Sequence, residues 1–177
     1  MTTIPTAYGP RDTFIPGDDV RDDERDAFDD FVRARFPHLV RFGRALTGST
    51  EAGADLVQDA LERTLLDWSR LESRDDPEGF VRRIMVNRNI SIWRKFGRER
   101  PTDEIRDGGR DDRHFDSDLW RALTMLPPRQ RAVIVLRYYE DQSEAEIARI
   151  LGCSAGTVKS QASKALAKLR QIVPVDR

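Results

Sequence analysis

Apolar residues recur every three or four positions along most of the chain, which is the spacing of one face of an α-helix. From Phe28 this pattern predicts a helix that Pro37 breaks or kinks and that Gly48 ends. Ser49 or Thr50 then caps a further helix, because a side-chain oxygen there can accept a free backbone N–H. The residues expected to face inward on that helix are Leu56, Val57, Ala60, Leu61, Leu65 and Trp68.

Asp76 and Pro77 form a strong helix start, with a capping acid before a proline at the first helical position. This helix is expected to run to about Arg98 and to place Trp93 in the core. Residues 98–115 are almost entirely charged and contain glycine and proline, which is typical of a solvated linker.

Beyond the linker, a helix near Asp118 breaks at Pro127-Pro128 and resumes as far as Tyr139. The stretch 133–136 is β-branched like a strand, but its helical flanks favour a helix. The expected fold is therefore all-α, with two small helical modules joined by a flexible charged linker. The boundaries are a disordered acidic arm at 1–24, a first module at 25–97, the linker at 98–115 and a second module at 116–173.

The stretch 143–170 reads as two short helices joined by a tight turn. Ser143 and Glu146 have the spacing of a capping box, Gly152 suits a left-handed turn position, and Ser154 caps the second helix. Between residues 154 and 170 the ionisable side chains are all positive: Lys159, Lys164, Lys168 and Arg170. A helix-turn-helix of this kind places its second helix in the major groove of DNA, although a helical hairpin with a solvated cationic face would have the same pattern.

Charge is segregated along a chain whose net charge is only −1. Residues 11–30 carry nine acids and three arginines, a net charge of −6, whereas residues 80–100 carry seven basic residues and one acid, a net charge of +6. This segregation indicates a local cationic surface suited to phosphates rather than a uniformly basic coat.

The single cysteine, Cys153, allows neither an internal disulfide nor a thiolate zinc site, so no metal or cofactor is expected. His38 and His114 have no catalytic or metal spacing and are expected to be surface residues, which argues against an enzyme. No apolar run approaches the ~20 residues of a membrane span, and no signal peptide is evident, so a cytoplasmic protein is expected.

Three segments in this order carry a specific resemblance: DLVQDALERTLLDW at 55–68, DPEGFVRRIMVNRNISIWRK at 76–95, and the stretch 126–170. Together with the arm and linker, they resemble the extracytoplasmic-function (ECF) sigma factors of the sigma-70 family, and within it the actinobacterial SigE-like group. Members of this family are promoter-specificity subunits of RNA polymerase. The resemblance implies that a region 2-like first module binds core polymerase and melts the −10 element, and that a region 4-like second module binds the −35 duplex.

The resemblance also implies roles for individual residues. The polar ridge that would dock on core polymerase is Asp55, Gln58, Asp59 and Glu62. Asn87 would line a pocket for an unstacked base of the −10 element, closed by the loop 69–74. Trp93 could stack on a base there, although a tryptophan on an amphipathic helix is more often a core residue. The cations expected to follow phosphates there are Arg82, Arg83, Arg94, Lys95 and Arg98. The residues expected nearest the −35 duplex are Ser154, Thr157, Lys159, Ser160, Ser163 and Lys164.

The main alternative is a stand-alone helix-turn-helix transcription regulator, which would be expected to dimerise across two half-sites. The short sequence after the motif offers no heptad seam for that purpose. A further alternative is that this chain is itself an interaction protein such as an anti-sigma factor, but such a protein would not need the basic hairpin. The expected partners are core RNA polymerase and promoter DNA, with an anti-sigma factor as a further candidate. The acidic arm either competes with DNA for the basic helix at 80–100 or for the basic hairpin, or it only solubilises the chain.

Overall fold

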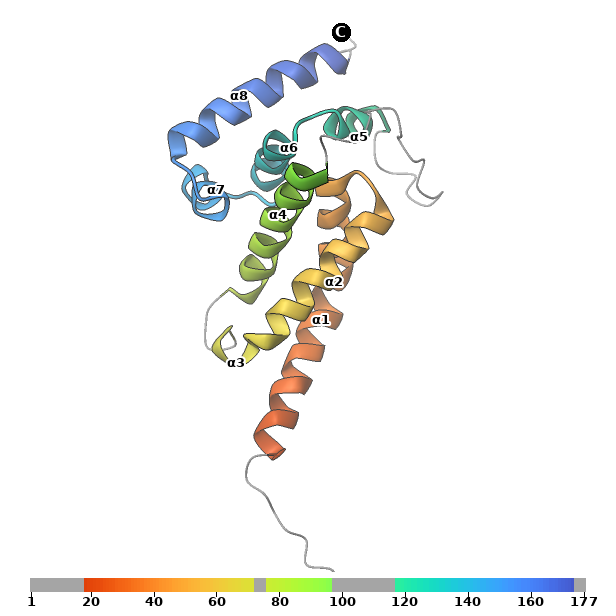
Figure 1. The fold of residues 1–177 in the computed structure, drawn as a ribbon, viewed down its shortest axis with the longest axis vertical. Helices are drawn as coiled ribbons and strands as arrows, with labels where there is room; N and C mark the ends of the chain where they lie inside the picture. The colour runs from red at the N-terminus through yellow and green to blue at the C-terminus, as the bar shows by residue number, and fades with distance from the viewer. Residues whose placement is uncertain (1–17, 72–75, 97–116, 174–177) are drawn as a thin grey trace, which may run out of the picture.

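The computed structural model describes residues 18–71, 76–96 and 117–173, and every regular element in these ranges is helical. This confirms the all-α prediction (Figure 1). Residues 1–17 of the predicted arm, the loop at 72–75 and the whole of the predicted linker lie outside the described residues. The helices are α1 (Asp18–Thr47), α2 (Thr50–Leu66), α3 (Trp68–Leu71), α4 (Pro77–Phe96), α5 (Ser117–Thr124), α6 (Pro128–Ile134), the π-helical η1 (Val135–Tyr139), α7 (Glu144–Leu151) and α8 (Ala155–Ile172).

Helix α1 differs from its prediction at two places. It begins at Asp18, so residues 18–24 are helical rather than part of a disordered arm. The helix also continues through Pro37 instead of breaking there. It ends where expected, just before Gly48, which has a φ of 81°.

Helices α1 and α2 run antiparallel and side by side, and they cross at two glycines that the hydrophobic pattern does not reveal (Figure 1). A Cβ on Gly43 would lie 2.6 Å from the Gly53 carbonyl oxygen, and a Cβ on Gly53 would lie 2.5 Å from the Arg44 nitrogen. The two helix backbones therefore touch at a distance that only glycine allows.

Substituting Gly53→Ala is expected to push α1 and α2 apart and to lower the free energy of unfolding by about 2 kcal/mol, the usual range for an overpacked core. Thermal or urea unfolding followed by circular dichroism measures this change. Gly156→Ala is the matched control, because the nearest atom to its added Cβ is 3.8 Å away, and it should be neutral or stabilising. Equal stability of the two variants would contradict the close crossing.

Two residues predicted for the core, Leu65 and Trp93, are exposed instead. Leu65 is 47% exposed because α2 ends at Leu66, and Trp68 starts the separate short helix α3. Trp68 itself is buried, with its ring centroid 5.1 Å from that of Phe28. Trp93 is 51% exposed, near the end of α4, so its prediction as a core residue is wrong.

The second module has the caps that its sequence predicts. The Ser143 hydroxyl accepts the Glu146 N–H while the Glu146 carboxylate accepts the Ser143 N–H, which completes a capping box. Gly152 has the left-handed φ of 60°, and Ser154 caps α8. The stretch 133–136 is helical, as expected, and continues into η1. A π turn adds a residue to the helix, and here it is followed by the buried Glu140.

The first module (α1–α4) and the second module (α5–α8) share one apolar core. Val81 and Met85 of α4 belong to the same buried cluster as Ile147 and Leu151 of α7. Helix α4 packs against both α6 and α7. Helix α8 is the outermost helix of the second module and lies at the opposite end of the molecule from the start of α1 (Figure 1). None of the helices in the described ranges combines the length and apolarity that crossing a membrane requires.

Candidate functional site

Helix α8 presents most of the residues predicted to face duplex DNA. Its N-terminal turn is capped, because the Ser154 hydroxyl accepts the Thr157 N–H at 3.1 Å and lies 2.9 Å from the Thr157 hydroxyl. Val158, Ala162 and Ala165 bury the opposite side. Thr157 is half-buried, and the exposed members of the predicted set are Ser154, Lys159, Ser160, Ser163 and Lys164. The structure therefore brings the predicted set together on one helix.

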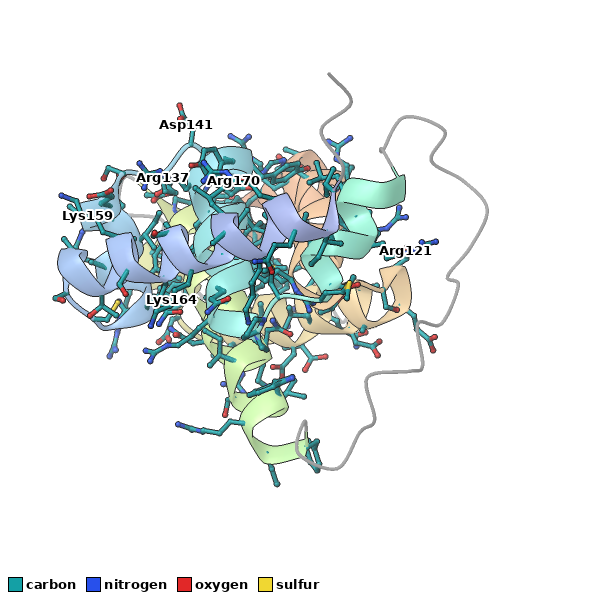
Figure 2. All side chains as sticks on the ribbon, turned by 90° about the horizontal axis from the view of Figure 1, so that it is seen from above. Arg121, Arg137, Asp141, Lys159, Lys164 and Arg170 are labelled. Carbon is teal, nitrogen blue, oxygen red and sulfur yellow. The ribbon has the colours of Figure 1, made fainter. Side chains whose placement is uncertain are left out.

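A basic groove that the sequence prediction missed runs between η1 and α8. It encloses about 270 Å³ and is lined by Arg137 and Tyr138 of η1 and by Lys159, Ser163 and Arg170 of α8, among others. In Figure 2, Arg137, Lys159 and Arg170 gather along one edge of α8, and Lys164 lies at the other edge. Glu144 pairs with Arg137 at 3.0 Å and with Lys159 at 3.6 Å. Arg137 could not be assigned to this groove from the sequence, because the direction of its side chain depends on the π-helical turn of η1.

The cations predicted for the −10 element divide into two groups. Arg83, Arg94 and Lys95 are exposed on α4, and Lys95 lies 5.1 Å from the centre of the Phe96 ring. Arg82 instead turns toward the second module, where it pairs with Glu140, and its side chain is only 12% exposed. Arg98 lies outside the described residues.

Asn87 also contacts the second module. Its side-chain amide donates a hydrogen bond to the Ile150 carbonyl of α7 at 3.2 Å. The residue predicted to line a base pocket therefore forms a hydrogen bond to the second module of its own chain. No sequence rule predicts a hydrogen bond between residues 63 positions apart.

The predicted ridge on α2 forms one continuous polar surface. Asp55, Gln58 and Glu62 are exposed, and the Gln58 amide donates to Glu62 at 3.1 Å. Asp59 is half-buried because Arg88 of α4 lies 2.9 Å from its carboxylate. Beside the ridge, a groove of about 480 Å³ is lined by Asp55, Asp59 and Arg88 together with the exposed apolar residues Ile92, Trp93 and Phe96. The ridge therefore borders an apolar edge suited to a protein partner.

A cluster of ionisable side chains lies where α1, α4 and the second module meet. His38 Nε2 lies 3.0 Å from Glu140 Oε1 and 3.7 Å from Glu78 Oε1, and the His38 ring stacks on Tyr139. Burial is the main cause that raises the pKa of Tyr139, so its hydroxyl stays neutral. The expectation that His38 is a plain surface residue is wrong, because the fold brings it to two carboxylates distant in sequence.

These three side chains have the geometry of a metal site, since their ligand atoms lie within 4.8 Å of one another. Each carboxylate, however, already has a guanidinium on its other oxygen: Arg35 lies 3.2 Å from Glu78 Oε2, and Arg82 pairs with Glu140 Oε2. The two arginines balance the two carboxylates, so a divalent cation would add uncompensated positive charge. The cluster is therefore better described as an ion-pair network that joins the modules.

Arg131 of α6 makes a second connection between the modules. Its guanidinium donates to the Leu46 carbonyl at the end of α1 and to the Thr124 and Leu126 carbonyls of its own module. Burial lowers the pKa of Arg131 to about 10, so the side chain remains charged at neutral pH. Asn89 of α4 also donates to the Leu46 carbonyl, at 3.2 Å. Arg131 and Asn89 together satisfy the Leu46 carbonyl, which lies in the last turn of α1 and has no partner within that helix.

Substituting Arg131→Met is expected to lower the free energy of unfolding by about 3 kcal/mol. The Thr124 and Leu126 carbonyls lose their side-chain donor, and the Leu46 carbonyl keeps only the Asn89 amide. Chemical denaturation of the full chain measures this loss. Arg121→Met, at an exposed position of α5, removes the same charge and should change stability by less than about 0.5 kcal/mol. A loss in both variants alike would show that charge, and not the carbonyl contacts, sets the effect.

Two protein-family models match the chain. Sigma-70, region 4 matches residues 116–169, and the Sigma2 domain of PhyR matches residues 32–84. These matches fall in the second and the first module respectively.

Several whole proteins are similar over most of their length. The RNA polymerase sigma-E factor of Streptomyces coelicolor is 39% identical over 149 residues, covering 81% of this chain and 84% of that protein. The RNA polymerase sigma factor SigV of Bacillus subtilis is 30% identical over 80% of this chain and 82% of its own length. Among solved structures, the sigma factor RpoE of Bartonella quintana, in complex with the anti-sigma factor NepR, matches with a TM-score of 0.69 and 28% identity, covering 85% of this chain and 99% of that one.

Proposed function

We propose how two modules divide the work of promoter recognition, on the premise that this chain belongs to the ECF sigma factors of RNA polymerase, which direct promoter-specific transcription initiation. The observation that carries the proposal is the presence of a region 2-like and a region 4-like module in one chain, each with its expected polar surface exposed. A stand-alone helix-turn-helix regulator would not need the first module, so that alternative is not favoured.

The second module is the part that reads the −35 duplex. Supporting this, α8 is the outermost helix, its exposed side chains are short or cationic, and its capped N-terminal turn would point backbone N–H groups toward phosphates. The groove of Arg137, Lys159 and Arg170 adds positive charge along one edge of the helix (Figure 2). Base edges would be read by Ser160 and Ser163, and phosphates would be held by the lysines.

Lys164→Ala is expected to weaken duplex binding by the holoenzyme about threefold to tenfold at low salt and to reduce the salt dependence by about one released counterion. Lys168→Ala is the matched control, since it removes the same charge from the same helix at a position outside the predicted contact set. The probe is a duplex pool selected with the wild-type holoenzyme and measured by fluorescence anisotropy. Equal losses in both variants would mean that net charge alone drives binding.

The first module is the part that binds core RNA polymerase, through the ridge at Asp55, Gln58, Asp59 and Glu62. Adjacent acceptors on one helix face complement a basic partner surface, and the neighbouring exposed Trp93 and Phe96 extend the contact with apolar area. The exposed cations Arg83, Arg94 and Lys95, with Asn87, would then hold the melted −10 strand.

Replacing Asp55, Gln58 and Asp59 together by alanine is expected to abolish core-dependent run-off transcription while duplex binding by the second module remains. The control replaces Asp22, Asp23 and Asp26, exposed acids on α1, and should leave transcription unchanged. Promoter-dependent initiation by wild-type protein with core polymerase, and none by either component alone, is the primary test. Absence of such initiation would contradict the proposed function.

The remaining expectations follow from this role. A subunit that positions polymerase carries out no chemistry of its own, so we do not assign an enzymatic activity. Transcription takes place on chromosomal DNA, which corresponds to a cytoplasmic location. An anti-sigma factor is a further candidate partner, because the similar RpoE structure contains one.

A further inference from the structure

Arg88 of α4 reaches across to α2 and contacts the polar ridge, although no sequence pattern assigned it to that surface. Its Nε lies 2.9 Å from Asp59 Oδ2. The two residues belong to different helices of the first module, and α2 packs directly against α4. Helix α4 therefore supplies a side chain to a surface whose other members all come from α2.

The contact with Arg88 occupies only one of the two carboxylate oxygens of Asp59. Oδ2 is buried, whereas the Asp59 side chain as a whole keeps 32% of its exposure. Arg63, one turn further along α2, comes only within 3.6 Å of Oδ1, and its own side chain is 52% exposed. Oδ1 is therefore the oxygen of Asp59 that a partner can reach.

An ion pair between two partly exposed side chains adds little to the stability of a fold. Its larger effect here is on the conformation of Asp59. A carboxylate with no fixed contact moves among several rotamers, and a partner that needs one of them must stop this motion when it binds. Arg88 restricts the motion of Asp59 before any partner is bound.

The surroundings of Arg88 set it apart from the other cations of α4. Arg88 lines the groove of about 480 Å³ beside the ridge, together with Asp55, Asp59 and the apolar Ile92. The exposed Arg83 lines a different groove, which α4 shares with the second module. Of these two arginines, only Arg88 is placed to act on the ridge.

We propose that Arg88 is a positioning residue for the binding of core RNA polymerase: it holds Asp59 in the orientation in which Oδ1 accepts a donor from a basic partner surface. Arg88 acts through Asp59 and does not itself contact the polymerase. The inference rests on the proposed function, which assigns the ridge to core RNA polymerase. It differs from a purely structural role, in which the ion pair would only hold α2 against α4.

The test variant is Arg88→Met in the full chain, which keeps an apolar stem in the groove and removes the guanidinium. Each variant displaces a fluorescein-labelled wild-type chain from core RNA polymerase without DNA, so that phosphate contacts do not contribute. Arg88→Met should weaken core binding about threefold to tenfold, because Asp59 then becomes ordered only on binding. Arg88→Lys should recover part of the loss, since its ammonium can still pair with Oδ2.

Two comparisons separate positioning from other roles. In a double-mutant cycle, adding Arg88→Met to Asp59→Asn should cause no further loss of core affinity, because Arg88 acts only through Asp59. The urea midpoint of Arg88→Met should fall by less than about 0.5 M, as expected for a partly exposed pair. The matched control is Arg83→Met, which removes the same charge from the same helix and should bind core polymerase like the wild type.

Several results would overturn the positioning role. Unchanged or tighter core binding by Arg88→Met would show that Arg88 does not help Asp59 or competes with the polymerase for it. Additive losses in the cycle would make Arg88 a direct contact, and a larger fall in the urea midpoint would make the pair structural. If the triple replacement of Asp55, Gln58 and Asp59 leaves core affinity unchanged, the proposed function fails as well. A loss in the triple variant but none in Arg88→Met overturns the positioning role alone.

Discussion

The arrangement of this protein depends on one buried ion pair, between Glu140 of the second module and Arg82 of α4. Apolar packing alone would let the modules dock in several ways, since hydrophobic contact is not directional. A carboxylate that is almost fully buried fixes one register, because only one placement supplies both Arg82 and His38 to it. Arg131, buried against the end of α1, adds a second fixed point. The surfaces that remain exposed are those that this docking leaves uncovered.

The three candidate functional surfaces are consequently in different states. Helix α8 and the ridge on α2 are open, and they would serve the duplex and the polymerase. Helix α4 is divided. Arg83, Arg94 and Lys95 are exposed, whereas Arg82 is largely buried against the second module. Asn87 is exposed but donates a hydrogen bond to that module. This side of α4 thus has two alternative partners, the second module and single-stranded DNA. The free energy of docking between the modules sets how strongly the protein resists replacing the first partner by the second.

Most of the fold could be predicted from the sequence, since local rules determine it. The capping box at Ser143, the left-handed turn at Gly152 and the start of α4 after Asp76 each depend on residues a few positions apart. The sequence did not predict contacts between distant residues: the Gly43–Gly53 crossing, His38 beside Glu140, and Asn87 on the Ile150 carbonyl. Trp93 was misassigned for a related reason, because helical periodicity identifies an apolar residue without showing whether a neighbouring element covers it. The roles of the candidate site residues remain predictions.

On the proposed function, polymerase binding exchanges an internal contact of α4 for an external one. Energy transfer between dyes on Glu51→Cys of α2 and Gln171→Cys of α8, recorded while core RNA polymerase is added to the full chain with Cys153→Ser, measures this exchange most directly. The high-transfer population of the free protein should be replaced by a low-transfer population in every transcriptionally competent complex. A competent complex that retains the high transfer of the free protein would contradict it.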